Sequence, residues 1–283
     1  MHPLTDITVV EVSARHPITI AAVPSPPDVH VVVPTLGTRP ESLHEALTSI
    51  RDQDVPADIT IVAPSSSESA RAAAREFNAQ FVEDPGALSA AINKGMALRL
   101  PHYKYVTWLN DDDVWVAGSL RATFQALEGD PRAVVAFGWC EYVDAAGRTL
   151  WVSKVGRWAV RVLNWGPDLI PQPGMLIRAS AWDQVGGLDE SYRLAFDFDL
   201  LLRLKKLGPL VDTQMLVSRF QWHPDSLTVD DRSTNLRESE RAKRSALPVW
   251  LRPISHVWDV PVRVAIKLAV ARVNRRARST TVV

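Results

Sequence analysis

The sequence predicts an α/β fold, in which a mixed, mainly parallel sheet is flanked by helices. Over residues 29–113, short apolar runs alternate with helix-length segments, which is typical of parallel strands joined by helical crossovers. Polar or structure-breaking residues follow three of these runs directly, at Pro34-Thr35, Ala63-Pro64 and Asp111–Asp113. The 283 residues, 46% of them hydrophobic and 23% charged, suffice for one large soluble domain with an appendage.

The elements of the first half follow in order from these patterns. Val29–Val33 is a continuous apolar run closed by Pro34, and it predicts the first strand of the main sheet. Leu43, Leu47 and Ile50 recur at helical spacing and predict a helix over 41–51. Further strands are expected at 59–62, at 81–82 and from 105 up to the acids, and further helices at 70–77 and 88–100.

After residue 113 the regular alternation is lost. A helix is expected over 120–127, and strand-like segments at 133–143 and 149–155 flank a turn whose Gly147 suits a hairpin. The remaining predictions are a strand at 175–177, a helix at 181–185 and a helix at 198–207 that Gly208-Pro209 ends.

Residues 105–113 read Tyr-Val-Thr-Trp-Leu-Asn-Asp-Asp-Asp, a buried-strand pattern that ends in three consecutive carboxylates. Adjacent carboxylates repel one another, so the cluster costs stability unless a cation neutralises it. Hard oxygen ligands suit Mg²⁺ or Mn²⁺, particularly an ion that also holds phosphates. The alternative is a solvated acidic turn, or a cluster that caps a helix over 114–127. Because three strand ends would meet at one edge, where sheets of this kind bind ligands, we favour a ligand site.

A second group of acids lies where a loop enters the helix predicted at 198–207. Asp197 and Asp199 are both placed to cap that helix, and one of them would do so. The other would lie at a helix mouth facing the same crevice, where a carboxylate can act as a general base. Spacing alone leaves both roles open.

Taken in order, the motifs resemble those of a family 2 glycosyltransferase of the inverting, GT-A type. They are Val31–Thr35 with Arg39, Ala91–Gly95, Trp108–Asp113, Gly186–Glu190, Asp197–Leu200 with Leu202–Leu204, and His223. The resemblance covers residues 29–228. It implies a transferase that moves a sugar from a nucleotide-diphosphate donor to an acceptor hydroxyl, with help from Mn²⁺ or Mg²⁺.

The resemblance also implies roles for individual residues. Asp197 matches the general base, whereas Asp199 fits a helix-start residue. Asp113 is the first choice as metal ligand, with Asp111 and with His223 near the diphosphate. The residues expected at the nucleotide-sugar are Pro34, Thr35, Arg39, Asn93, Asp111 and Asp112.

One departure from the family pattern concerns the nucleotide base. Members commonly carry one or two acids just after the second strand, where this chain reads Ala63-Pro64-Ser65-Ser66-Ser67. Glu68 and Asp84 are candidate substitutes. Uracil, thymine and guanine therefore all stay open as the donor base.

With this resemblance, the chain divides into three parts. Residues 1–28 form an extension, with a hairpin over 7–23 and a Pro-rich linker. Residues 29–247 form the GT-A catalytic domain, with a Rossmann-like nucleotide-sugar half at 29–113 and an acceptor half at 114–247. Residues 248–283 form a basic amphipathic helix, because they hold seven basic residues and one acid, Asp259.

The C-terminal helix leaves two interpretations open. Over 257–278, apolar residues gather on one side and basic residues on the other, a pattern of helices that lie on anionic membranes. Trp250 and Trp258 would then be interfacial anchors. Alternatively, the helix packs on the catalytic domain with its basic face in solvent. Peripheral membrane contact would suit a glycan or lipid-linked acceptor in cell-envelope glycan or glycolipid synthesis.

Composition also bears on location and partners. Cys140 is the only cysteine, so we expect no intrachain disulfide and a reducing, cytoplasmic location, at most peripheral at the inner face of the cell membrane. Neither a signal peptide nor a spanning helix is expected from the apolar pattern. Lys+Arg and Asp+Glu balance at 32 each and the basic tail holds no reading motif, so no nucleic-acid partner is expected. The sequence leaves the oligomeric state open.

Two other functions compete with sugar transfer. A sugar-1-phosphate nucleotidyltransferase also uses a parallel sheet and acids on Mg²⁺, but a Gly- and Lys/Arg-rich phosphate loop would be expected after the first strand. Residues 34–40 hold one Gly and one Arg. A non-catalytic nucleotide-sugar-binding protein is suggested by the missing acids near Ala63, whereas the intact Asp111, Asp113 and Asp197 argue against it.

Overall fold

The computed structural model describes residues 27–84, 86–144, 146–154, 156–222, 232–255 and 257–264. The strands are β1 (Val29–Pro34), β2 (Ala57–Ala63), β3 (Gln80–Glu83), β4 (Tyr105–Trp108), β5 (Asp113–Trp115), β6 (Val135–Val143), β7 (Thr149–Ser153), β8 (Leu176–Arg178) and β9 (Leu210–Gln221). The helices are α1 (Pro40–Arg51), α2 (Glu68–Glu76), α3 (Leu88–Ala97), α4 (Ser119–Gly129), α5 (Gly156–Val162), α6 (Ala179–Val185), α7 (Phe196–Leu204) and α9 (Arg232–Ala246), followed by the 3₁₀ helix η1 (Val249–Ile254).

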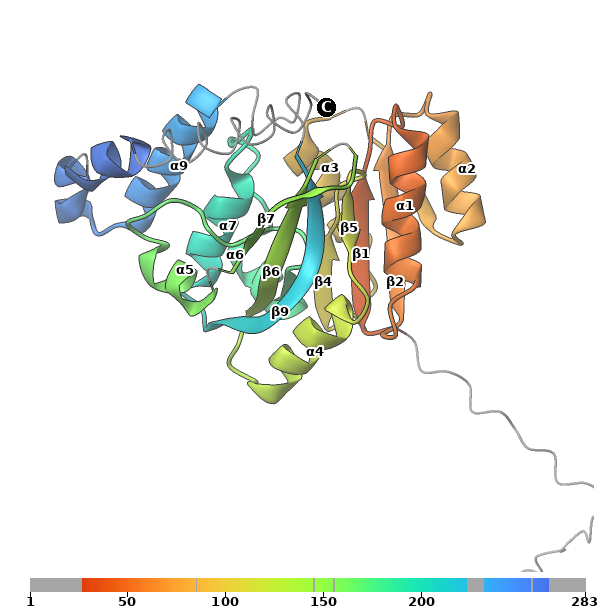
Figure 1. Cartoon of the computed structure of the whole chain (residues 1–283), viewed down its shortest axis with the longest axis horizontal. Coiled ribbons are helices and arrows are strands. Elements are labelled where there is room, and N and C mark those ends of the chain that lie inside the picture. Colours follow the sequence, from red (N-terminus) through yellow and green to blue (C-terminus); the bar gives the residue numbers. More distant parts are fainter. Residues whose placement is uncertain are drawn as a thin grey trace, which may run out of the picture.

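The described strands form one mixed sheet in the order β3-β2-β1-β4-β8-β6-β9-β5, with β7 paired to β6 (Figure 1). Strands β3, β2, β1 and β4 run parallel to one another. Strand β8 is antiparallel to both β4 and β6, and β9 is parallel to β6. Because β8 runs opposite to both β4 and β6, these two strands point in the same direction. The carboxyl ends of β1, β2, β4, β6 and β9 therefore all lie at one edge of the sheet. We call it the carboxyl edge.

Helices cover both faces of the sheet because successive strand residues point to opposite faces. Val31 and Val33 of β1 pack with α1, α2 and α4, whereas Val32 packs in a second cluster with α3, α6 and α7. The apolar runs are therefore continuous because each strand is buried on both sides, as in other sheets of this class. The two hydrophobic clusters, one on each face of the sheet, form the two cores that fix the positions of the strand ends at the carboxyl edge.

The structure confirms the predicted fold class and most predicted elements. It adds four elements that the sequence did not predict, namely β5, α5, β9 and α9, and residues 249–254, inside the helix expected over 248–283, form the 3₁₀ helix η1. Asp113 does not cap a helix over 114–127, because β5 forms first by pairing with β9 and α4 begins at Ser119. The hairpin expected at 7–23 and the part of the C-terminal helix beyond residue 264 lie outside the described residues.

The described part of the C-terminal region packs on α9. Lys243 and Asp259 form an ion pair of 2.8 Å with both side chains almost fully buried, and Arg263 pairs with Glu240 at 2.6 Å. The rings of Trp165 and Trp258 also meet edge to face, 5.0 Å apart. No helix among the described residues is long and apolar enough to span a membrane.

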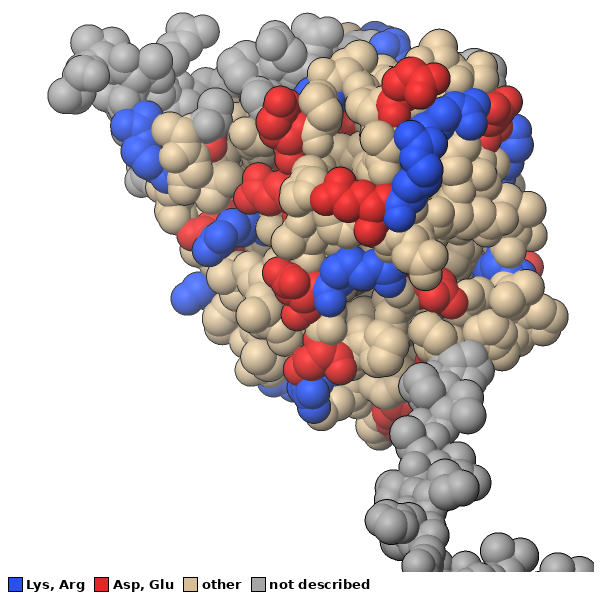
Figure 2. Space-filling view, turned by 90° about the vertical axis from the view of Figure 1, so that its right-hand side faces the viewer, with Lys and Arg blue, Asp and Glu red and all other residues tan. Residues whose placement is uncertain are grey.

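Charges of both signs are intermixed on the face that carries α1 and α2 (Figure 2). Acidic and basic side chains lie next to one another there, without a broad patch of one sign. Binding to nucleic acid relies on clustered positive charge. This face therefore offers no such surface.

Candidate active site

The first feature of the carboxyl edge is a hydrogen bond between two strand ends. Thr35 follows β1 and Asp111 follows β4, and the Thr35 hydroxyl donates to Asp111 Oδ2 at 2.5 Å. The backbone N–H of Gly37 donates to Thr35 Oγ1 at 2.8 Å. Gly37 has φ +72°, and a Cβ there would lie 1.8 Å from Ser67 Oγ, so this tight turn requires glycine. The loop after β1 is thus pinned against the loop after β4.

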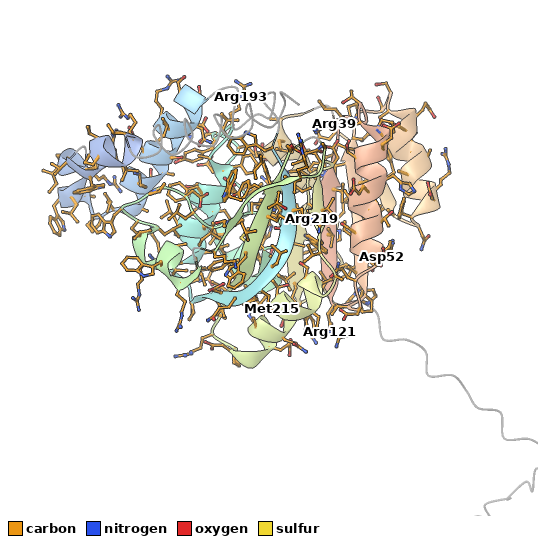
Figure 3. The ribbon with its side chains drawn as sticks, viewed as in Figure 1. Arg39, Asp52, Arg121, Arg193, Met215 and Arg219 are labelled. Atoms are coloured by element: carbon orange, nitrogen blue, oxygen red, sulfur yellow. The ribbon has the colours of Figure 1, made fainter. Side chains whose placement is uncertain are left out.

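Arg39 completes this cluster. Its guanidinium donates to Asp111 Oδ1 at 2.6 Å and to Asp112 Oδ2 at 2.7 Å. Figure 3 shows Arg39 at the carboxyl edge, beside the start of α1. Burial raises the pKa of Asp111, against the hydrogen bond from Thr35 and the charge of Arg39. Thr35, Arg39, Asp111 and Asp112, which the sequence assigned to one site, therefore lie together.

Asp113 is placed differently from its neighbours. It starts β5, its side chain is fully buried, and Asp113 Oδ2 accepts a hydrogen bond of 3.1 Å from Asn110. Burial, followed by the charge of Asp112, raises the pKa of Asp113 well above its usual value. From the sequence, Asp113 is the residue first expected to bind the metal directly. Its burial makes Asp112 the more accessible carboxylate.

The residues present fit a divalent cation in donor chemistry. Asp111, Asp112 and Asp113 offer hard oxygen atoms, and the buried Asp113 Oδ1 and Asn110 Oδ1 have no hydrogen-bond partner. In this structure the guanidinium of Arg39 balances part of the negative charge. No group of three or more His, Cys, Asp or Glu side chains is gathered as a metal centre within the described ranges. His223, expected near the metal, lies outside them.

The place where the nucleotide base is expected lies beside β1 and β2. Pro34 ends β1 in a buried position and pairs with Val62 of β2. Asp84, directly after β3, is the more enclosed of the two candidate acids, and it accepts a hydrogen bond of 2.6 Å from the N–H of Gly86. Glu68 is exposed at the start of α2.

Asn93 contacts a different part of the molecule from the one we expected. Its amide donates to the Leu188 carbonyl and to Glu190 Oε1, each at 2.9 Å, and its oxygen accepts from the Leu188 N–H at 2.9 Å. These bonds tie α3 to the loop between α6 and α7. The Asn93 side chain is therefore engaged with the loop that leads to Asp197, rather than with the cluster around Asp111.

Asp197 lies in the first turn of α7 and has an unforeseen neighbour, Asp168. Asp197 Oδ1 accepts from the Phe198 N–H at 2.8 Å, and burial raises the pKa of Asp197 to about 6. Burial, and then the charge of Asp197, raises the pKa of Asp168 well above its usual value. Both side chains are half-buried rather than sealed from solvent. Two carboxyl groups so coupled titrate as a pair, and one of them keeps its proton more readily.

Asp199, two residues further on, has a purely structural environment. Its carboxylate pairs with Arg203 at 2.7 Å, one helical turn away. Arg203 also donates to the carbonyls of Val185 and Gly187, at 2.8 and 2.7 Å. The N-cap residue of α7 is Ala195, which makes no side-chain capping hydrogen bond, so the prediction that Asp197 or Asp199 caps this helix is wrong.

Glu238 of α9 holds the loop that leads to Asp197. Its carboxylate accepts hydrogen bonds from the backbone N–H groups of Arg193, Leu194 and Ala195, at 3.0, 2.8 and 3.0 Å. Although burial favours the neutral acid, these donors hold the pKa of Glu238 below its usual value. Sequence patterns gave no sign of this residue, which lies 41 positions after Asp197.

We expect Glu238→Gln to lower the free energy of unfolding by about 1–3 kcal/mol, because the loop loses charge-assisted bonds. Urea unfolding monitored by tryptophan fluorescence measures the change. Glu45→Gln, on the exposed side of α1, is the matched control and should leave the midpoint unchanged. Equal midpoints for Glu238→Gln and the wild type would show that the loop does not depend on this anchor.

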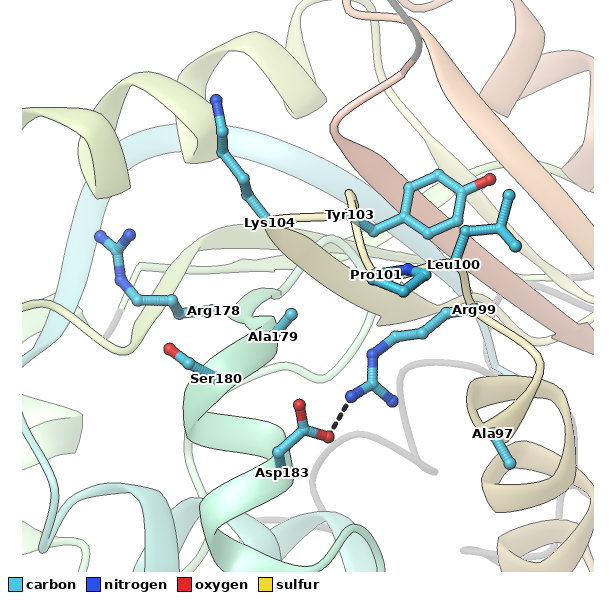
Figure 4. Close-up of a pocket in the computed structure, with 10 residues that line it drawn as sticks. All are labelled: Ala97, Arg99, Leu100, Pro101, Tyr103, Lys104, Arg178, Ala179, Ser180 and Asp183. Atoms are coloured by element: carbon cyan, nitrogen blue, oxygen red, sulfur yellow. Dashed lines mark hydrogen bonds and ion pairs between the residues drawn. The ribbon is translucent and has the colours of Figure 1, made fainter.

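A hollow of about 620 Å³ lies at the opposite edge of the sheet (Figure 4). It is lined by residues that precede β4 and by residues around the end of β8. Its charged groups are already paired, as in the ion pair between Arg99 and Asp183. The candidate active site is therefore the carboxyl edge and not this hollow.

Comparison with known proteins agrees with this geometry. The model of the family described as Glycosyl transferase family 2 matches residues 30–179. Uncharacterised glycosyltransferases of Rickettsia conorii and Rickettsia felis are each 20% identical over 152 residues, which is 51% of this chain and 25% of theirs. The chain thus spans about a quarter of the length of the curated relatives that it matches.

Solved structures show the same fold. S. aureus TarS 1–349, in complex with UDP-GlcNAc, has a TM-score of 0.58 at 14% identity, covering 77% of this chain and 66% of TarS. The mannosyltransferase PcManGT of Pyrobaculum calidifontis, in complex with GDP-Man and Mn²⁺, has a TM-score of 0.58 at 18% identity, covering 87% and 75%. These similarities establish a GT-A-like fold. Because the family model matches more than half of its length, the chain belongs to glycosyl transferase family 2.

Proposed function

We propose that this chain transfers a sugar from a nucleotide-diphosphate donor to an acceptor hydroxyl, with inversion at the anomeric carbon. The observation that carries the proposal is that the carboxyl edge holds the cluster of Thr35, Arg39, Asp111 and Asp112 together with a separate carboxylate, Asp197, of pKa about 6. The cluster around Asp111 suits a diphosphate and its counter-ion, and the carboxylate of Asp197 suits proton transfer. Membership of the family favours sugar transfer over nucleotidyl transfer.

The first cluster would hold the leaving diphosphate. Asp111 and Asp112, above the buried Asp113, would hold a divalent ion together with His223. When bound, such an ion neutralises charge on the leaving group. Arg39 can offer its guanidinium to phosphate oxygens as it now does to two carboxylates. Thr35 fixes Asp111 through its hydroxyl and so orients one wall of the donor site.

Asp197 would act as the general base. As the acceptor oxygen bonds to the anomeric carbon, the bond from that carbon to the diphosphate oxygen breaks, and the hydroxyl proton passes to Asp197. Attack from the face opposite the diphosphate inverts the configuration. A base with a pKa near the working pH is efficient. Burial raises the pKa of Asp197 to about 6, and the charge of Asp197 in turn helps to raise the pKa of its neighbour Asp168.

This assignment predicts an acid limb in the pH profile. We expect kcat/KM to fall below about pH 6, because protonated Asp197 cannot accept the hydroxyl proton. In Asp168→Asn the limb should stay near pH 6, because burial, and not the charge of Asp168, raises the pKa of Asp197. Initial rates between pH 4.5 and 9 measure both profiles. A limb that moves in Asp168→Asn, or a profile flat through pH 6, would count against this assignment.

Thermal shift tests the donor class. TarS and PcManGT, the two solved structures of the same fold, contain UDP-GlcNAc and GDP-Man with Mn²⁺, respectively. The panel therefore consists of UDP-, GDP- and dTDP-sugars with Mn²⁺. A ligand that binds only the folded state raises the melting temperature. We expect at least one nucleotide-sugar to stabilise the protein more than its nucleoside monophosphate does. No shift with any nucleotide-sugar would contradict the proposed donor class.

We further propose peripheral membrane contact through the C-terminal region. Trp250, Ile254, Val257 and Val260 expose 74%, 47%, 65% and 52% of their surface, on a segment next to the basic tail. We expect co-sedimentation with anionic vesicles, weakened in Trp250→Ser/Val257→Ser. Trp158→Ser, which removes an exposed tryptophan from α5, is the control. Equal sedimentation of the double variant and the wild type would refute this contact.

A further inference from the structure

A cluster of four aromatic rings occupies the carboxyl edge at the ends of β6, β7 and β9. Tyr142 stacks on Trp151 with ring centroids 3.9 Å apart and planes 7° from parallel. Trp222 meets Trp151 edge to face at 5.3 Å, and Phe220 lies 5.4 Å from Tyr142. We call these four residues the aromatic platform.

Strand pairing places the platform beside the acidic triplet Asp111–Asp113. Trp151 pairs with Tyr142, Tyr142 with Phe220, and Phe220 with Asp113. Paired residues of neighbouring strands lie on the same side of a sheet. One line across the sheet therefore joins Asp113 of the acidic triplet to Phe220, Tyr142 and Trp151, in that order.

The platform also lies within electrostatic reach of the proposed base. After burial and Cys140, the groups that raise the pKa of the Tyr142 hydroxyl are Asp168, Asp113 and Asp197. The Coulomb energy between two groups falls as the distance between them grows, so charges that shift this pKa belong to the surroundings of the Tyr142 hydroxyl. The phenol of Tyr142 therefore lies near both groups of acids that the proposed reaction uses.

Core packing does not account for these rings. The aromatic side chains of the two cores, such as Trp108, Phe137 and Phe198, are only 1% exposed. Tyr142, Trp151, Phe220 and Trp222 are all half-buried. Large amphipathic rings that stay partly exposed next to polar groups are typical of ligand sites, where an apolar face meets the ligand and a polar end meets water.

We propose that the aromatic platform binds a sugar ring of the acceptor, so that the acceptor is a saccharide rather than a bare lipid phosphate or a peptide. A pyranose has an apolar face of C–H groups that covers an aromatic ring, while its hydroxyls stay at the rim. Stacked there, one hydroxyl of the ring is presented toward Asp197. The assignment of the bound sugar as acceptor rests on the proposed transferase function; the binding itself does not.

Saccharide binding without donor tests the platform. The probes are cellotetraose, maltotetraose, chitotetraose and mannotetraose, with dodecyl phosphate as the lipid probe and a Ser/Thr-rich peptide as the third. Saturation-transfer NMR and tryptophan fluorescence follow binding to the full chain. We expect at least one oligosaccharide to bind, with the strongest saturation on the C–H groups of one ring face.

Variants locate the binding. In Trp151→Ala and Trp222→Ala we expect affinity to fall at least about fivefold, as for the loss of an aromatic contact. Trp222→Tyr should keep part of the affinity, because it keeps an aromatic ring. Thermal unfolding checks that each variant folds. Trp158→Ala, which removes an exposed ring on α5, should bind as the wild type does. Binding unchanged in all the platform variants, or binding of dodecyl phosphate or the peptide but no saccharide, would overturn the proposal.

The two proposals fail separately. If the wild type binds an oligosaccharide through Trp151 and Trp222 but releases no nucleoside diphosphate from any nucleotide-sugar, the transferase function fails and the saccharide platform stands. If it releases nucleoside diphosphate but binds no saccharide, the platform fails alone.

Discussion

Asp197→Asn is expected to lower turnover by about 10²–10⁴, the usual contribution of a general base, while the donor-induced thermal shift persists. Asparagine has nearly the shape of aspartate but cannot accept the hydroxyl proton. Initial rates of nucleoside diphosphate release with a saturating acceptor measure the loss. Turnover near that of the wild type would remove Asp197 from the mechanism.

The same variant is expected to be more stable than the wild type above pH 6. The pKa of Asp197 is about 6 in the folded chain and about 3.9 when unfolded. The folded state therefore binds more protons between these values, and stability falls as pH rises through that window. Asn carries no charge to desolvate, so at pH 8 we expect a gain of about 1 kcal/mol or more.

Asp199→Asn provides the matched comparison, two residues away on the same helix. Burial raises the pKa of Asp199 as well, but this variant leaves the partly buried Arg203 without its carboxylate partner and should be less stable than the wild type. Urea unfolding at pH 8 should therefore move the two variants in opposite directions. A loss of stability in Asp197→Asn would mean that its carboxylate is held by favourable contacts, contrary to a base poised for proton transfer.

Asp112→Asn should have the next largest effect, a fall in turnover of about 10²-fold or more. The accessible carboxylate next to Arg39 would be lost, and with it negative charge that would hold a divalent ion at the diphosphate. We expect the Mn²⁺ concentration for half-maximal activity to rise and the donor-induced thermal shift to shrink. Titration with Mn²⁺ measures both.

Controls separate a local effect from a general one. Asp52→Asn changes an exposed acid at the far end of α1, away from Arg39, and should behave as the wild type (Figure 3). Asp113→Asn tests the ligand first expected from the sequence. If it raises the Mn²⁺ requirement more than Asp112→Asn does, the buried carboxylate is the principal ligand after all.

The fold of residues 29–113 could be predicted because the information that specifies it is local. The apolar runs of β1, β2 and β4 are buried on both faces, and each ends in polar residues that a parallel sheet brings to one edge. The contact between Thr35 and Asp111 follows from that topology alone. Arg39 followed from the family pattern, and the structure shows which acids it contacts.

The fold of residues 114–247 could not be predicted in the same way, because pairings between distant residues define it. Strand β9 lacks alternation; it exposes Gln214 and Met215 and depends on its pairing with β6. The burial of Asp113 follows from its pairing with Phe220, 107 residues later in the chain. Tertiary packing alone brings Asp168 near Asp197 and Glu238 to the loop that leads to it, and no local pattern marks either residue.

The most direct measurement follows the sugar that the wild-type protein releases when water replaces the acceptor. With a UDP- or GDP-sugar that shifts the melting temperature, proton NMR records the anomeric signal before the released sugar mutarotates. From an α-linked donor, the proposed single displacement predicts that nucleoside diphosphate and the β-anomer appear together, with a rate that depends on Asp197. First appearance of the α-anomer, or no release from any donor that binds, would contradict an inverting transferase with Asp197 as its base.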